Sequence, residues 1–288
     1  MRTFFYFLGS ILSYVVCFSA NAQKIPALGL VESIEKDSLV YASGFTLIGE
    51  TVGKMLSPTL TEEQFQANLA QIKKAKTKLY LCNVLFPGSI KIAGPEVDPK
   101  KVVDYLDQVF TRAKKANVPV IVLGSGGSRR LPAGYDTDKA KTDFVALCKQ
   151  MALVAKKHDI TIAIESLNST ETNFLTTVQE AAEIVQKVNH PNFRLNADIY
   201  HMMKENEPPQ HIIDAGKLIV HVEIAEKEKR TMPGVMGDDF RPYFRALKQI
   251  KYRGPIVIEA RVSNANVEIP AAHLYLTKQL AEVYGKGK

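Results

Sequence analysis

Short apolar runs alternate with longer amphipathic segments along almost the whole chain. The apolar runs are rich in valine, isoleucine and leucine, as expected of strands buried on both faces of a parallel sheet. They predict strands at residues 27–31, 41–48, 78–85, 118–123, 160–164, 194–197, 218–224 and 255–258. The segments between them predict helices at residues 61–75, 99–116, 137–158, 174–188, 209–215, 240–250 and 271–284.

This alternation is typical of repeated βαβ units. Helix-start signals support it: Asp98 precedes Pro99, which suits an N-cap followed by proline in the first turn. No G-x-G-x-x-G sequence opens a helix after the first strand, which disfavours a dinucleotide-binding sheet. Eight strand–helix units fit the usual length of a (β/α)₈ barrel, about 250 residues. The sequence therefore predicts one α/β domain, a (β/α)₈ TIM barrel over residues 23–288.

The first 22 residues have the composition of an export signal. Met1 and Arg2 give a positive start, an apolar run follows over residues 4–16, and an A-x-A site ends at Ala22. We expect cleavage near Ala22 and an exported product, periplasmic or secreted. The apolar run is too short to span a bilayer comfortably, and no later segment resembles a membrane span, so no membrane partner is expected.

Charge and cysteine content narrow the functional classes. The formal net charge is +7, and the lysines are spread over the predicted helices, which is typical of solvated helix faces rather than of a nucleic-acid-binding stripe. Beyond residue 22 two cysteines remain, Cys82 and Cys148, and both lie in apolar contexts. Two scattered cysteines do not form a disulfide framework, so buried thiols are expected. The oligomeric state stays open, with a homo-oligomer among the alternatives.

Four consecutive predicted strands carry a carboxylate at their C-terminal ends. The carboxylates are those of Glu165, Asp198, Glu223 and Glu259, and His221 shares the strand face of Glu223 because side chains alternate. In a parallel barrel these ends meet at one mouth, where active sites of this fold lie. Converging carboxylates repel one another unless a cation lies among them. The oxygen-rich set favours Mn²⁺ or Mg²⁺, with Co²⁺ as a further candidate, over a structural zinc.

Two predicted loops add polar groups at the same end. Residues 124–132 combine three glycines with Arg129 and Arg130, which suits a phosphate, a pattern of sugar hydroxyls or a structural turn. Residues 229–234 form a second basic turn that includes Arg230.

The residues from Gly124 to Glu259 resemble the xylose-isomerase-like TIM-barrel sugar isomerases and epimerases, in particular the D-tagatose/D-psicose 3-epimerase type. The matching pieces are Gly124-Ser125-Gly126 with Arg129-Arg130, Ile164-Glu165-Ser166-Leu167-Asn168 with Glu171 and Asn173, Asp198-Ile199-Tyr200-His201-Met202, His221-Val222-Glu223 with Arg230 and Pro233-Gly234, and Ile258-Glu259.

This resemblance implies a metal-dependent isomerase or epimerase of a free keto-sugar or polyol. Glu165 and Glu259 would be the catalytic pair: one removes a proton next to a carbonyl, giving an enediolate, and the other returns a proton on the opposite face. The implied metal ligands are Glu165, Asp198, Glu223 and Glu259. The implied substrate-binding residues are His201, Arg230, Glu171, Asn168 and Arg130.

The seventh strand departs from the family pattern, which usually shows His-x-His with the second histidine as a ligand. Here the second position is Glu223. Either Glu223 binds the metal in an all-carboxylate site, or the metal lies towards His221, or the site binds no metal. An all-carboxylate site favours Mg²⁺, Mn²⁺ or Ca²⁺. Glu226, and one extra residue before Arg230, are further differences from the family pattern.

Three other functions compete with an isomerase or epimerase. A lyase or hydrolase acting on a keto-polyol or a 3-keto-glycoside needs the same proton abstraction and, in addition, a β-leaving group. An endonuclease-IV-like repair enzyme is disfavoured, because the third and fourth strand ends, at Asn83 and Gly124, carry no histidine. A non-catalytic sugar-binding protein is disfavoured by the retained pair Glu165 and Glu259.

Overall fold

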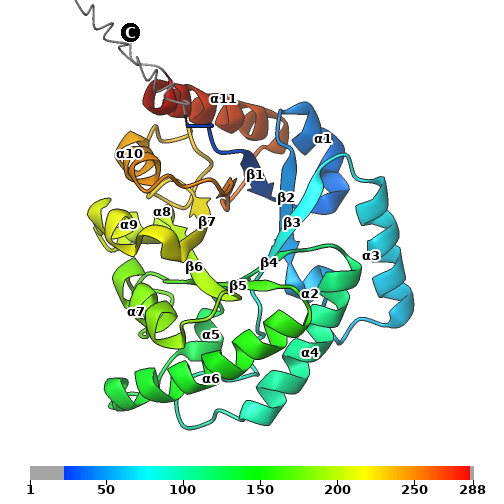
Figure 1. Cartoon of the computed structure of the whole chain (residues 1–288). Helices are drawn as coiled ribbons and strands as arrows, with labels where there is room; N and C mark the ends of the chain where they lie inside the picture. The colour runs from blue at the N-terminus through cyan, green and yellow to red at the C-terminus, as the bar shows by residue number, and fades with distance from the viewer. Residues whose placement is uncertain (1–22, 286–288) are drawn as a thin grey trace, which may run out of the picture.

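Eight parallel strands close into a single barrel in the computed structural model, which describes residues 23–285 (Figure 1). Each strand pairs with its neighbours along the chain, and β1 closes on β8. The strands are β1 (Leu28–Val31), β2 (Leu47–Thr51), β3 (Lys78–Asn83), β4 (Val120–Leu123), β5 (Thr161–Glu165), β6 (Phe193–Asp198), β7 (Ile219–Ile224) and β8 (Ile256–Ile258). The predicted TIM barrel is confirmed. The expected export signal, residues 1–22, lies outside the described residues.

Helices surround the barrel, as Figure 1 shows. The connecting helices are α3 (Glu62–Lys74), α4 (Pro99–Lys115), α6 (Thr137–Lys157), α7 (Val178–Val188), α9 (Gln210–Ala215), α10 (Arg241–Gln249) and α11 (Ala265–Tyr284). The shorter ones are α1 (Asp37–Ala42), α2 (Val52–Met55), α5 (Gly126–Arg129), α8 (Ile199–Lys204) and the 3₁₀ turns Ile34–Lys36 and Gly216–Leu218. Asp98 caps α4 as predicted, since its carboxylate accepts from the N–H of Lys101.

The prediction of one strand over residues 41–48 is wrong in its first half. Tyr41 belongs to α1, and Gly44, with φ of +99°, separates this helix from β2. Asp37, at the start of α1, accepts hydrogen bonds from the backbone N–H groups of Lys76 and Thr77, both at 2.8 Å. These bonds tie the helix to the start of β3, and no local apolar pattern encodes so distant a contact.

The interior of the barrel changes from apolar to acidic towards the C-terminal ends of the strands. Its apolar part is a cluster of Leu81, Val120, Val122, Ala163 and Val257. Two residues after Ala163, on the same strand face, lies Glu165. The inward positions of β6 and β7 become polar at the same height, so the fold itself brings polar side chains to one mouth.

Two further sequence expectations concern the described part of the chain. Cys82 and Cys148 are buried free thiols, as expected. None of the helices within residues 23–285 combines the length and the apolar character needed to cross a membrane.

Candidate active site

The four predicted carboxylates converge at the mouth of the barrel. Glu165, Asp198, Glu223 and Glu259 each place one carboxylate oxygen so that the four oxygens lie within 4.8 Å of one another. The register explains this: Asp198 of β6 pairs directly with Glu223 of β7. The first three side chains are buried, and that of Glu259 is 21% exposed. The predicted convergence is confirmed as geometry, while the roles of the four residues as ligands stay predictions.

The electrostatics of this carboxylate cluster suit a hard divalent cation. Burial first, and repulsion by the neighbouring carboxylates second, raise the pKa of Glu223 and of Glu259 to about 8. The same causes raise the pKa of Glu165 well above its usual range. One buried oxygen each of Glu165 and Glu223 has no hydrogen-bond donor, which leaves it available as a ligand. Carboxylate oxygens are the donors that Mg²⁺, Mn²⁺ and Ca²⁺ prefer.

Asp198 and His201 lie on either side of the β6–α8 junction. Asp198 caps α8 with Oδ1, which accepts from the N–H of Tyr200 at 2.7 Å, and Oδ2 faces the cluster. Nδ1 of His201 accepts from the N–H of Asn168 at 3.0 Å, so the proton of the neutral imidazole lies on Nε2. That Nε2 is 3.3 Å from Oε1 of Glu165 and 3.6 Å from Oδ2 of Asp198. The predicted sugar contact His201 therefore lies directly beside the carboxylates.

The geometry on β7 favours Glu223 over His221 as the ligand. His221 is fully buried, its Nε2 is 3.6 Å from Oε1 of Glu223, and burial lowers its pKa to about 4, so the imidazole is neutral. Within residues 23–285 two groups of side chains bring their possible ligand atoms within 4.8 Å of one another: the four carboxylates, and the set Glu165, Asp198 and His201. His221 belongs to neither group. Asn196 donates to the other oxygen of Glu223 at 2.5 Å and so orients this carboxylate.

Arg230 covers the cluster from the loop after β7. Its guanidinium forms an ion pair with Glu259, lies 3.4 Å from Oδ2 of Asp198 and 3.7 Å from Oε1 of Glu171, and stacks over the ring of Tyr200 at 4.6 Å. Burial opposes the charge of this guanidinium, but the carboxylates, Glu259 foremost, outweigh burial and hold its pKa above the usual range.

The predicted polar residue Glu171 also faces this mouth. Asn168 donates to Oε1 of Glu171 at 3.0 Å, which links two predicted substrate-binding residues. The Glu171 side chain is 39% exposed, so it remains accessible at the rim.

The glycine-rich segment after β4, for which the sequence leaves a ligand-binding loop and a structural turn open, packs against the carboxylate cluster. Residues 126–129 form the short helix α5, and a Cβ added at Gly124 would collide with Oε2 of Glu165. Glycine at 124 therefore makes room for a carboxylate of the cluster. Arg130 is exposed and reaches the carbonyl of Thr170 at 3.5 Å, so the structure does not bring it into the cluster.

Arg129, rather than Arg130, places a positive charge behind the cluster. Its side chain is fully buried, and none of its guanidinium nitrogens has a hydrogen-bond partner. Burial lowers its pKa to about 10, and the negative charge of Glu165 is the first influence that opposes this lowering. The guanidinium thus stays cationic at neutral pH and offsets part of the negative charge of the carboxylates.

The substitution Gly124→Ala is expected to displace the Glu165 carboxylate while leaving the fold intact, because the collision falls on the flexible end of that side chain. We expect at least about tenfold weaker Mn²⁺ binding, since one ligand is misplaced. Gly127→Ala is the matched control, because its Cβ would come no closer than 3.8 Å to Gly88. Calorimetry and circular dichroism measure the two effects. Equal Mn²⁺ affinity in both variants would contradict this role of Gly124.

Three residues of the site were not singled out from the sequence. Asn83 donates to Oε1 of Glu259, Asn196 holds Glu223, and Tyr200 lies under Arg230. Asn83 is the last residue of β3, as Glu165 is the last residue of β5. Its position at a strand end is therefore a signal in the sequence that points to Asn83. Asn196 lies two residues before Asp198, on the same strand face.

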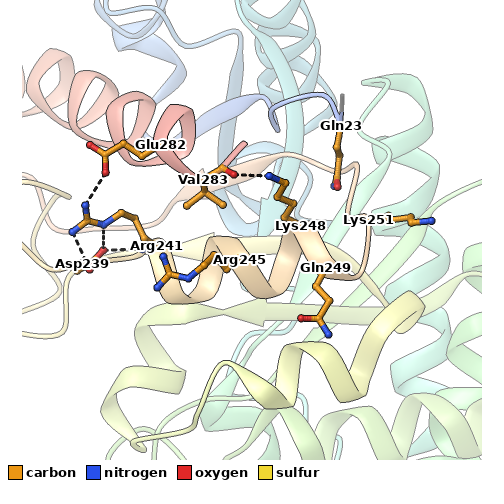
Figure 2. A pocket seen from close by; sticks show the side chains of 9 residues that line it. All are labelled: Gln23, Asp239, Arg241, Arg245, Lys248, Gln249, Lys251, Glu282 and Val283. Atoms are coloured by element: carbon orange, nitrogen blue, oxygen red, sulfur yellow. Dashed lines mark hydrogen bonds and ion pairs between the residues drawn. The ribbon is translucent and has the colours of Figure 1, made fainter. Parts of the chain in front are cut away.

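A cavity of about 870 Å³ lies away from the mouth, between α10 and α11 (Figure 2). The Arg241 guanidinium on its wall is paired with Asp239 and Glu282, each at 2.7 Å. Lys248 donates to the carbonyl of Val283 at 2.7 Å. These charges join α10 to α11 and form no group of convergent acids, so the barrel mouth remains the candidate active site.

Known relatives share parts of this chain. L-ribulose 3-epimerase of Methylomonas sp. (strain DH-1) is 36% identical over 121 residues, which cover 42% of each protein. A putative hydroxypyruvate isomerase of Mus musculus is 32% identical over 172 residues, 57% of this chain and 61% of that protein. The chain thus spans about two-fifths to three-fifths of the length of these curated relatives.

A solved structure and a family match cover more of the chain. The structure of an L-ribulose 3-epimerase superposes with a TM-score of 0.76 and 18% identity, covering 90% of this chain and 95% of that one, which shows a common fold. Residues 39–279 match the family described as "Xylose isomerase-like TIM barrel". Because this match takes in most of the chain, the protein belongs to the xylose isomerase-like TIM-barrel family.

Proposed function

We propose that the protein is a metal-dependent isomerase or epimerase of a free ketose or a related keto-polyol. The observation that carries this proposal is the group of four carboxylate oxygens within 4.8 Å of one another at the barrel mouth. The relatives named as an L-ribulose 3-epimerase and a "putative hydroxypyruvate isomerase" support it. Both of those reactions move a proton on a carbon next to a carbonyl, and a pair of carboxylates suits that chemistry.

In this proposal the metal is held by Glu165, Asp198, Glu223 and Glu259. The all-carboxylate donor set favours Mn²⁺ or Mg²⁺, with Ca²⁺ or Co²⁺ as alternatives. A divalent ion bound there supplies positive charge that stabilises the oxyanion formed when a proton leaves the carbon next to the carbonyl.

Glu165 and Glu259 transfer the protons. They come from β5 and from the end of β8, with β6 and β7 between them, so they approach a substrate from different sides. One carboxylate takes the proton and leaves an enediolate, and the other returns a proton to the opposite face. In the ion-free site, burial foremost raises the pKa of both carboxyls, the direction that suits a carboxylic acid able to return a proton.

The substrate is held by residues around the carboxylate cluster. Arg230, Glu171, His201 and Asn168 offer donors and acceptors that suit sugar hydroxyls. Arg130 is the weakest member of the predicted set, because its side chain points to Thr170. The composition of residues 1–22 supports export, and an exported enzyme meets sugars rather than the mostly cytosolic sugar phosphates.

Deuterium exchange from D₂O, followed by NMR across ketoses, inososes and keto-glycosides, tests this function. We expect deuterium to enter at least one ketose next to its carbonyl when Mn²⁺ or Mg²⁺ is present. A lyase or hydrolase would show the same exchange together with loss of a β-substituent. The absence of exchange in every compound, with either metal, would contradict the proposed function.

A further inference from the structure

A buried carboxylate in the loop after β7 has no part in the proposed chemistry. Glu226 follows β7 and is fully buried, but it belongs to neither group of candidate metal ligands within residues 23–285. Its two oxygens accept five hydrogen bonds of 2.5–3.2 Å. The donors are the hydroxyl of Thr231 and the backbone N–H groups of Gly234, Met236, Gly237 and Asp238.

These bonds make residues 226–238 a closed loop around one carboxylate. An ionised carboxylate only accepts hydrogen bonds, and charge-assisted bonds to several N–H groups offset the cost of burying it. The ends of the loop also meet, since the N–H of Lys227 donates to Oδ2 of Asp238 at 2.7 Å. On the outer side Tyr275 of α11 donates to the carbonyl of Asp238 at 2.9 Å. We call this segment the Glu226 loop.

The inner edge of the Glu226 loop carries Arg230. Lys229 and Arg230 both have left-handed backbones, with φ of 57° and 55°, which residues other than glycine adopt only where their surroundings hold them. The carbonyl of Arg230 accepts from the N–H of Arg261 at 2.7 Å. Held in this way, the Arg230 side chain reaches Glu259 and Asp198.

We propose that Glu226 is a positioning residue that fixes the Glu226 loop and thereby holds the Arg230 guanidinium against the carboxylate cluster. It acts through Arg230 and touches none of the groups assigned to proton transfer. The inference rests on the proposed function for the meaning of Arg230, but its structural part can be measured without any substrate.

Glu226→Gln tests the structural part. The side chain keeps its size, but its new amide nitrogen is a donor and faces N–H groups, so the bonds to one oxygen are lost. Glu228→Gln is the matched control, because Glu228 lies in the same loop, is exposed and loses the same charge. Mass spectrometry of amide hydrogen exchange should show residues 231–238 exchanging about 10- to 100-fold faster in Glu226→Gln and unchanged in Glu228→Gln. Equal exchange in the two variants would overturn the proposal.

Mn²⁺ affinity then measures the position of Arg230. A cation beside the cluster opposes metal binding, so Arg230→Gln should tighten Mn²⁺ binding several-fold. Glu226→Gln should tighten it in the same direction, and the double variant should bind no more tightly than Arg230→Gln, as expected when one residue acts through the other. The proposal would be wrong if the effects of Glu226→Gln and Arg230→Gln on Mn²⁺ affinity added up in the double variant. It would also be wrong if Glu226→Gln and Glu228→Gln bound Mn²⁺ with equal affinity.

Activity provides the third measurement. If the wild-type chain exchanges deuterium into a ketose, Glu226→Gln should raise KM about 10-fold or more while kcat falls less, and Glu228→Gln should change neither. If the wild-type chain acts on no ketose, the proposed function fails, while hydrogen exchange still decides whether Glu226 holds its loop.

Discussion

Glu165→Gln and Glu259→Gln are each expected to reduce deuterium exchange into the substrate by about 10²- to 10⁴-fold, the usual contribution of a positioned acid or base. A glutamine amide keeps the size of the side chain but neither removes nor returns a proton at neutral pH. Each substitution also removes one negative charge from the carboxylate cluster, so metal binding should weaken as well. NMR in D₂O measures the exchange under saturating Mn²⁺.

A control separates catalysis from folding in these variants. Glu63→Gln makes the same chemical change at an exposed position on α3 and should leave exchange unchanged. Circular dichroism should show wild-type secondary structure in all three proteins. Exchange that survives at the wild-type rate in both Glu165→Gln and Glu259→Gln would remove them as the proton-transfer pair.

The second large effect is expected in the stability of the protein when EDTA keeps it free of metal ions. The pKa of Glu223 and of Glu259 is raised to about 8, against an ordinary value of about 4.3, so the folded state holds protons that the unfolded chain releases. The contribution of these two groups to the free energy of unfolding is therefore greatest below a pH of about 4.3. It is lost as the pH rises to about 8. A tenfold difference in proton affinity between the folded and unfolded states corresponds to about 1.4 kcal/mol, so the loss is a substantial part of the stability of a domain.

Unfolding in urea between pH 5 and pH 8 measures this loss. With EDTA the free energy of unfolding should fall across that interval, while with Mn²⁺ it should stay level because the ion relieves the repulsion. Asp37 acts in the opposite direction and only in more acid solution: its hydrogen bonds lower its pKa against the effect of burial, so its contribution is lost as the pH falls. Glu223→Gln, with one carboxylate fewer, should flatten the EDTA profile. Identical profiles with EDTA and with Mn²⁺ would contradict this expectation.

The barrel and the carboxylate cluster could both be predicted from the sequence, for the same reason. Glu165 and Glu259 each end an apolar run and Asp198 ends a predicted strand, and the C-terminal ends of parallel strands meet at one mouth. Local pattern is enough for such features, because the regular fold supplies the distant contacts.

Features that depend on specific distant contacts could not be predicted in this way. Which of the two arginines, Arg129 or Arg130, is buried beside the cluster depends on the turn of a four-residue helix. Such a helix is too short to show a periodicity in the sequence. The need for glycine at 124 depends on where the Glu165 side chain points. In the sequence, Glu226 is only a difference from the family pattern. The folded loop shows the five hydrogen-bond donors that surround its carboxylate.

Glu223 decides the character of the proposed metal site. The structure places its carboxylate among the other three and leaves His221 outside both groups of candidate ligands in the described chain. Four carboxylates with Arg129 and Arg230 nearby form a strongly charged but partly compensated site. This composition favours Mg²⁺, Mn²⁺ or Ca²⁺ over ions that prefer nitrogen or sulfur ligands.

Calorimetric titration of the EDTA-treated chain with Mn²⁺ and with Mg²⁺ tests the central claim, that the four carboxylates hold one divalent ion. One ion should bind per chain, and it should bind more weakly to Asp198→Asn and to Glu223→Gln than to the wild-type protein. No heat of binding at millimolar concentrations of either ion, or binding that both substitutions leave unchanged, would contradict it.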